Sequence, residues 1–228
     1  MSCCFTRVHY TDEGRPHTSF QQSFCGGTSV SDTMAALQVL KDRLRALQRD
    51  LERLYALEAG PDVASFVRLD ETHEHETLLV RQSSEAELEL ALVFPASIDP
   101  QAAPASNDHL ELLEGVSHFV YIAERARTQL PTTQLELELQ AEVDKFALLS
   151  ERIAPPALSH LHQKLFERVR YLHAEDTPRG QRYRLANRLA ARFWSRLMTL
   201  ADPTSQCESL RRFYRAGQAD KIRLVAAA

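Results

Sequence analysis

Leucines recur at alternating steps of three and four residues in the segment that follows residue 30. They are Leu37, Leu40, Leu44, Leu47, Leu51 and Leu54. This spacing places one narrow apolar seam along an α-helix. Ser31 or Asp32 is a suitable N-cap, and Gly60 followed by Pro61 stops the pattern. A helix is therefore predicted over residues 31–58. Because the seam spans only about two and a half heptads, we expect it to pack within its own chain, with a homodimer through 37–54 as the alternative.

The apolar pattern changes after Pro61 to one that favours strands. Segments 63–69, 77–82 and 87–94 are rich in strand-forming residues, and the last alternates so that Leu88, Leu90, Leu92 and Phe94 share one face, opposite Glu87 and Glu89. A turn is predicted over 83–86. These features indicate a small antiparallel sheet with one face in water. Pro95, Pro100 and Pro104 then mark a linker.

The rest of the chain reads as helices. Two are predicted over 107–130 and 133–153, joined at Pro131, the first capped by Asn107 or Asp108 and the second by a capping box of Thr133 and Glu136. Further helices are predicted over 158–172, from Thr177 to about residue 200, from Ser205 onward with Glu208 as its box partner, and over 218–225 after a break at Gly217.

These elements predict a mainly α (α+β) fold made of an N-terminal heptad helix, a small antiparallel β-sheet and a C-terminal helical bundle. The predicted organisation is a mobile N-terminal tail over 1–30, the helix and sheet over 31–105, and the bundle over 106–228, docked on them.

One acidic residue interrupts the apolar face of the helix predicted over 133–153. At about 100° per residue, Leu135, Leu139, Phe146 and Leu149 share that face. Glu142 projects from its middle, with Glu138 one turn earlier at its edge. Because a buried, unpaired carboxylate costs several kcal/mol, Glu142 and Glu138 are predicted to accept hydrogen bonds from His118, Arg125 or an arginine of the C-terminal helices.

The preceding helix carries polar residues that could meet this acid. Glu114 and His118 are one turn apart, and Arg125 lies on the same side. We interpret Glu114, His118, Arg125, Glu138 and Glu142 as a buried charge network. The alternative is a metal site, but helix-bundle di-iron proteins use Glu-x-x-His at spacing three on paired helices, whereas here the spacing is four and occurs once. Since structural ion pairs outnumber metal clusters without a motif, no metal or cofactor is predicted.

Arginines at every fourth position form a ridge on the helix predicted from Thr177. They are Arg184, Arg188 and Arg192, with Arg196 at the margin. Residues 155–228 carry 14 basic and 6 acidic residues, whereas residues 1–154 carry 13 and 25. The ridge is therefore predicted to meet acids of its own chain first, and otherwise an acidic protein or anionic ligand. RNA or a nucleotide is the least favoured partner because the net charge is −4.

Composition and motifs restrict the remaining classes. The longest apolar runs fall far short of the roughly 18 to 20 residues of a membrane span, and no signal-peptide pattern is present, so a cytoplasmic location is predicted. Cys3, Cys4, Cys25 and Cys207 lack the spacing of a zinc site and are expected to be free thiols. His73 and His75 lack a third ligand at fixed spacing, which favours a solvated turn.

The sequence contains no phosphate-binding loop, nucleophile elbow or His-Glu-x-x-His pair. Whether the protein is an enzyme therefore stays open. The preferred hypothesis is a non-catalytic interaction or regulatory protein that binds an acidic partner through its basic helical face and its leucine-seam helix. The alternatives are a carboxylate- and histidine-based metal enzyme in the helical bundle, and an RNA- or nucleotide-binding protein.

Overall fold

The computed structural model describes residues 30–84 and 87–226, so nearly all of the predicted tail and part of the predicted turn at 83–86 lie outside these ranges. The elements are α1 (Val30–Tyr55), the 3₁₀ turn η1 (Val63–Ser65), β1 (Val67–Asp70), β2 (Thr77–Ser84), β3 (Glu87–Pro95), α2 (Asn107–Arg127), α3 (Gln134–Ser150), the 3₁₀ turn η2 (Pro155–Ala157), α4 (Leu158–His162), the π-helical turn η3 (Gln163–Glu167), α5 (Pro178–Leu197), α6 (Pro203–Arg215) and α7 (Gln218–Ala226). This confirms the mainly α (α+β) fold.

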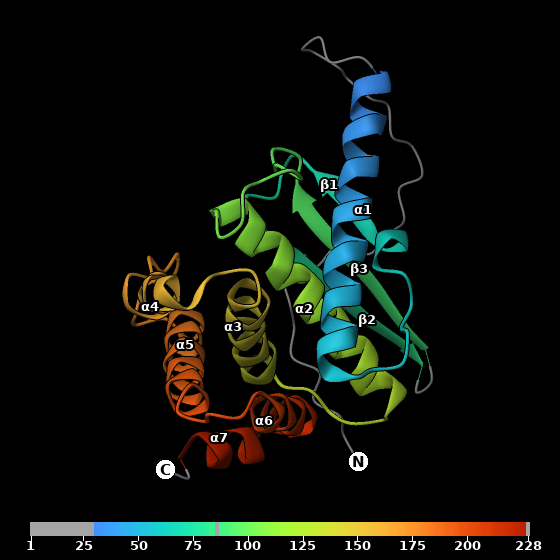
Figure 1. The fold of residues 1–228 in the computed structure, drawn as a ribbon. Coiled ribbons are helices and arrows are strands. Elements are labelled where there is room, and N and C mark those ends of the chain that lie inside the picture. Colours follow the sequence, from blue (N-terminus) through green and yellow to red (C-terminus); the bar gives the residue numbers. More distant parts are fainter. Residues whose placement is uncertain (1–29, 85–86, 227–228) are drawn as a thin grey trace.

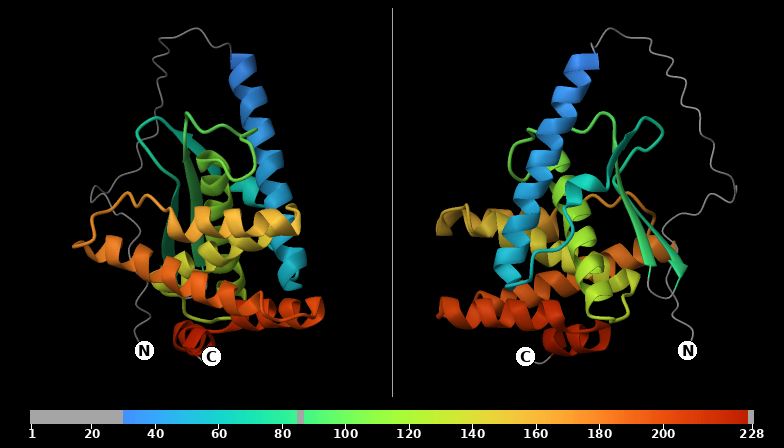
Figure 2. Two further views of the ribbon diagram at one scale, coloured as in Figure 1. Left: turned by 60° about the vertical axis from the view of Figure 1, so that its left-hand side comes forward. Right: turned by 90° about the vertical axis from the view of Figure 1, so that its right-hand side faces the viewer.

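The helices are arranged around α2 and α3. Helix α2 packs on β2 and β3, while α1 and α3 pack on α2. Helix α5 lies on α3, and α6 and α7 close one end of the molecule (Figures 1 and 2). Within residues 30–84 and 87–226, each helix is too short or too polar to span a bilayer.

The leucine seam of α1 is buried within its own chain. Leu40, Leu44, Leu47 and Leu51 are each at most 2% exposed and belong to a core shared with α2, α3 and the sheet. The helix ends at Tyr55, three residues before the predicted position, because Ala56 adopts a left-handed φ of 50°. A homodimer through this seam stays a prediction that no observed contact supports.

The sheet is mixed and not antiparallel throughout, which corrects the predicted topology. Its strand order is β1-β3-β2; β2 pairs antiparallel with β3, but β1 pairs parallel with β3 along Val67 to Asp70. The alternation of apolar residues indicates which face of a strand is buried but carries no information on the direction of its neighbour. Residues 63–65, predicted as strand, form η1, which Asp62 caps through the Ala64 amide.

The start of α3 is as predicted and the start of α2 is not. Thr133 and Glu136 form the predicted capping box at α3. At α2 the cap is Ser106, whose hydroxyl accepts a hydrogen bond from the His109 amide, and not Asn107 or Asp108. The Asp108 carboxylate instead accepts from the Asp99 amide, which ties the proline-rich linker to the helix.

The region predicted as one helix over 158–172 is shorter. Helix α4 continues into the π-helical turn η3 and ends at Glu167, and Leu172, expected on the inner face, is 67% exposed. Helix α5 begins after Thr177, as predicted, where the Thr177 hydroxyl accepts from the Gly180 amide. A Cβ on Gly180 would lie 1.8 Å from the Ala174 carbonyl oxygen, so only glycine fits there.

The last two helices meet at Gly217. Asp202, and not Ser205, caps α6 by accepting from the Thr204 and Ser205 amides. Helix α7 follows Gly217, as predicted, and buries Val225 together with Lys221, whose burial the sequence did not indicate. A single apolar cluster includes residues of α1, the sheet and the C-terminal helices. The division at residue 105 stays a prediction.

Candidate functional site

Glu142 has basic and polar partners, but they are not the predicted ones. Its side chain is 15% exposed, and one oxygen accepts from the Lys145 ammonium at 2.8 Å. The other accepts from the Asn187 amide of α5 at 2.8 Å. Asn187 also donates to the Leu165 carbonyl in the π-helical turn, so this residue joins three elements. Of the expected partners, His118 lies beside Glu138, for which it was also predicted, and Arg125 contacts Glu136.

Lys145 joins Glu142 to Glu114. Its ammonium lies 2.6 Å from Glu114 Oε2, which brings α2 and α3 together across a buried ion pair. Burial alone would lower the pKa of Lys145, but Glu114 and Glu142 outweigh burial and raise it. Burial alone would raise the pKa of Glu114, but Lys145 and His118 outweigh burial and lower it. Both groups are therefore charged at neutral pH.

His118 lies between two carboxylates without a hydrogen bond to either. Its Nδ1 is 3.8 Å from Glu76 Oε1, and its Nε2 is 3.8 Å from Glu138 Oε2. Within the described ranges, His118 Nε2 and Glu76 Oε1 are buried and have no hydrogen-bond partner. Burial alone would lower the pKa of His118, but Glu76, Glu138 and Glu114 raise it to about 9.

Glu138 is also incompletely paired. Its Oε1 is 3.7 Å from Arg182 Nε of α5, too far for a hydrogen bond, and that nitrogen is likewise buried without a hydrogen-bond partner in the described part of the chain. Burial raises the pKa of Glu138 to about 7, although His118 and Arg182 oppose this shift. Glu138 therefore has His118 and Arg182 as charged neighbours but a hydrogen bond to neither.

Glu76 reaches this cluster from the connection between β1 and β2. Its backbone amide donates to Glu111 Oε1 of α2, which fixes the connection against the helix. Gly115 of α2 allows the close approach, because a Cβ there would lie 2.8 Å from Glu76 Cγ. Glu76 is not among the site residues predicted from the sequence. A glycine inside a predicted helix was the available signal, since it often marks a close backbone approach.

Glu76, Glu114 and His118 together form a possible ligand set for a metal ion. Their ligand atoms all lie within 4.8 Å of one another. Atoms bonded to one ion at about 2.0 to 2.2 Å are roughly 3 to 4 Å apart, which matches the 3.8 Å between His118 and Glu76. Two carboxylates and one imidazole suit Zn²⁺, Mn²⁺, Fe²⁺ or Co²⁺. Three protein ligands also leave coordination positions open, as in catalytic sites.

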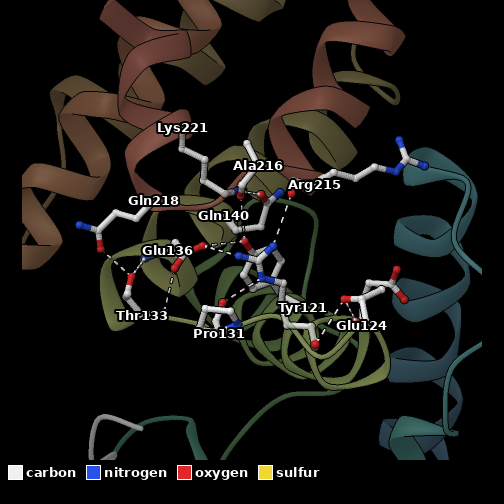
Figure 3. Close-up of polar contacts among 12 residues, drawn as sticks. Tyr121, Glu124, Pro131, Thr133, Glu136, Gln140, Arg215, Ala216, Gln218 and Lys221 are labelled. Atoms are coloured by element: carbon white, nitrogen blue, oxygen red, sulfur yellow. Dashed lines mark hydrogen bonds and ion pairs between the residues drawn. The ribbon is translucent and has the colours of Figure 1, made fainter. Parts of the chain in front are cut away.

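Arg125, which was expected in the same network, belongs to a second one. Its guanidinium lies 2.9 Å from Glu136 Oε1 and donates to the carbonyls of Pro131 and Arg215. Glu136 also accepts from the Thr133 amide and the Tyr121 hydroxyl. Figure 3 shows these groups converging from α2, α3 and the chain around Ala216. This network closes the α2–α3 turn against the start of α7.

A fully buried polar group lies deeper in the same region. The Asp144 carboxylate accepts from the hydroxyls of Tyr55 and Ser117 and from the Gln140 amide. The Lys221 ammonium donates to Gln140 Oε1 (Figure 3). Burial raises the pKa of Asp144 to about 6 and lowers that of Lys221 to about 7. Neither side chain is more than 1% exposed, so the group is closed to ligands in this structure.

Two arginines of the predicted ridge donate hydrogen bonds within the described part of the chain and the other two do not. Arg184 is half-buried, stacks on Tyr171 at 4.4 Å and donates to the carbonyls of His173 and Gly180. Arg196 is exposed and donates to the Leu224 carbonyl. Arg188 and Arg192 are exposed and make no hydrogen bond or ion pair within residues 30–84 and 87–226.

The other residues considered from the sequence make ordinary contacts. His73 lies 3.4 Å from Asp70, and His75 lies 4.0 Å from Glu111. Cys207 is a free, half-buried thiol, and the other three cysteines lie outside the described ranges.

Known proteins supply no further guide to the site. The chain matches no family model, no curated protein and no solved structure.

Proposed function

We propose that the protein binds a divalent transition-metal ion through Glu76, Glu114 and His118 and that its activity depends on this ion. The observation that carries the proposal is Glu76 Oε1, which is buried without a hydrogen bond within the described part of the chain and faces His118 Nδ1 at 3.8 Å, with a Glu114 oxygen within 4.8 Å. Leaving such an atom unpaired costs about 1 to 3 kcal/mol, and a bound ion would remove at least part of this cost. A divalent ion supplies Lewis acidity and lowers the pKa of bound water.

Charge balance supports the same proposal. Four carboxylates, Glu76, Glu114, Glu138 and Glu142, surround His118 and Lys145, and Arg182 lies beside Glu138. In the absence of an ion, protons on His118 and Glu138 compensate part of the negative charge, as their raised pKa values indicate. A cation bound to neutral His118 would replace these protons.

The test is a calorimetric titration of metal-free, untagged protein with Zn²⁺ and with Mn²⁺. We expect one ion per chain. Glu76→Gln and His118→Gln should each weaken binding at least about tenfold, because each removes a ligand. His162→Gln is the matched control, since His162 Nε2 is also buried without a hydrogen bond in the described ranges but its neighbours are Phe146, Phe166 and Glu167. Absence of stoichiometric binding by the unmodified protein, or equal weakening in the control, would mean that the cluster is only a structural charge network.

A second candidate function is the binding of an acidic protein by the exposed part of the arginine ridge. It is favoured by Arg188 and Arg192, which are exposed and have no acidic partner in the described part of the chain. Charged surfaces of this kind attract acidic partners and lose them as salt rises.

Retention on immobilised poly-glutamate tests this second candidate. The double variant Arg188→Gln/Arg192→Gln should elute at lower salt than the unmodified protein, whereas Arg53→Gln, exposed but paired with Asp50, should not. Equal elution of all three proteins would rule out the ridge as an acidic-partner surface. Binding to RNA at 50 mM salt would instead favour the nucleic-acid alternative.

A further inference from the structure

The polar side chains leading to the candidate metal centre become less exposed in steps. His75, on the connection between β1 and β2, is 53% exposed, and its Nδ1 lies 4.0 Å from Glu111 Oε1. Glu111 is 22% exposed and accepts from the Glu76 amide. The side chains of Glu76 and His118 are only 8% and 10% exposed. Imidazole and carboxylate groups thus lie at successive depths between solvent and the buried ligands.

The opposite side of the centre is less suited to the passage of a cation. Lys145 lies between Glu114 and Glu142, and Arg182 lies beside Glu138. Arg179 acts on Glu114 from the same helix as Arg182. A divalent ion approaching from α5 would meet these positive charges, and their repulsion is strong where little water screens it.

We propose that a divalent ion reaches Glu76, Glu114 and His118 past His75 and Glu111, which form the mouth of the centre. This inference rests on the proposed metal-binding function. The ion exchanges bound water for transient imidazole and carboxylate ligands as it passes inward, and acidic groups at such a mouth raise its local concentration. His75 and Glu111 affect the rate of passage, while the three inner residues determine the affinity.

Stopped-flow measurement of Co²⁺ binding tests the route in the full-length protein, with the visible absorption of bound Co²⁺ as the signal. In His75→Ala we expect the association and dissociation rate constants to fall together by about tenfold, leaving Kd unchanged, because a residue on the path alters the barrier and not the end states. Glu111→Gln keeps an oxygen that can accept from the Glu76 amide but removes the charge, and should also slow association. His73→Ala, in the same connection but paired with Asp70, is the control and should leave both rate constants unchanged.

The outcomes separate the two proposals. If the unmodified protein fails to bind Co²⁺, both the function and the route are wrong. If it binds but His75→Ala leaves both rate constants unchanged, only the route is wrong. A faster dissociation with unchanged association would make His75 a ligand, which also contradicts the route. Slowing in His73→Ala as large as in His75→Ala would show a general effect of the connection and would overturn the assignment to His75.

Discussion

At the scale of single residues, the molecule buries more charge than its hydrophobic pattern indicates. Glu142 interrupts an apolar face in the sequence pattern, yet Glu136 and Asp144 of the same helix are far less exposed, at 2% and 1%. An apolar stripe on one side of a helix predicts that the opposite side faces water. Helix α3 lies between α1, α2, α4 and α5, so nearly every side chain on it is buried. Polar residues on its predicted outer face therefore became interior residues with specific partners.

Lys221 provides a pH-dependent test of this burial. Its ammonium is fully buried against Gln140 and lies over the rings of Tyr121 and Phe213, with Asp144, Glu136 and Arg125 as the charged groups that act on it. Burial lowers its pKa from 10.5 to about 7. Between these values the unfolded chain holds the Lys221 proton and the folded chain does not, so raising the pH favours folding.

We therefore expect the free energy of unfolding to rise with pH between 7 and 9 by about 1 to 3 kcal/mol more in the unmodified protein than in Lys221→Met. Urea denaturation at several pH values measures this difference. The variant also leaves Gln140 Oε1 without its donor, but that loss is the same at each pH and cancels in the comparison. Parallel pH profiles of the two proteins would contradict the assigned pKa shift.

At the scale of elements, the contact of α2 with the sheet depends on one glycine. A Cβ on Gly115 would lie 2.8 Å from Glu76 Cγ and 3.0 Å from side-chain atoms of Leu92 and Phe94. The β1–β2 connection can therefore place Glu76 beside Glu114 and His118 only because α2 has no side chain at this position. The candidate metal centre is thus a consequence of how closely a helix and a strand connection approach.

Gly115→Ala is expected to destabilise the protein by about 1 to 2 kcal/mol, because overpacking exceeds the gain in helix propensity. It should also weaken metal binding by displacing Glu76. Urea denaturation and the Zn²⁺ titration measure the two effects. Gly60→Ala is the control, since its added Cβ would meet only atoms at 3.6 Å and beyond. A Gly115→Ala variant as stable as the control, with unchanged affinity, would show that the approach is not limiting.

At the scale of the whole molecule, basic side chains of the C-terminal half bind backbone carbonyls as well as acids. Arg182 of α5 lies 3.7 Å from Glu138 of α3, too far for a hydrogen bond. Arg211 and Arg215 of α6 instead donate to the Leu54 and Tyr55 carbonyls at the end of α1. Positive side chains are favourable at that position because the last carbonyls of a helix carry partial negative charge. They attach α6 to α1, which also packs on α2.

The burial of the α1 seam predicts how the whole molecule responds to its loss. Leu44 is fully buried, so Leu44→Ala should lower the free energy of unfolding by about 2 to 5 kcal/mol. Because the seam packs on its own chain, the variant should keep the molar mass of the unmodified protein in light scattering after gel filtration. Exposed Met34→Ala, on the same helix, is the control and should be nearly neutral. A change of molar mass in Leu44→Ala alone would instead favour the seam as a dimer contact.

The sequence by itself determined the local features of this protein. Periodicity located α1, α2, α3 and α5, and the side chains of Thr133, Glu136 and Thr177 identified two helix starts, because these signals act over only a few residues. The mainly α (α+β) class followed from them. Glu114, His118, Glu138 and Glu142 were recognised as unusual because polar residues near an apolar face need partners.

Only the tertiary structure decided which of those residues meet. Glu76 is 38 residues from Glu114 in the sequence and Lys145 is 31 residues away from it, yet all three lie at one centre, whereas Arg125 lies in another. The parallel pairing of β1 with β3 was likewise invisible in the strand pattern. Such contacts depend on how closely elements approach and in which direction they run, and spacing within a single element does not contain that information.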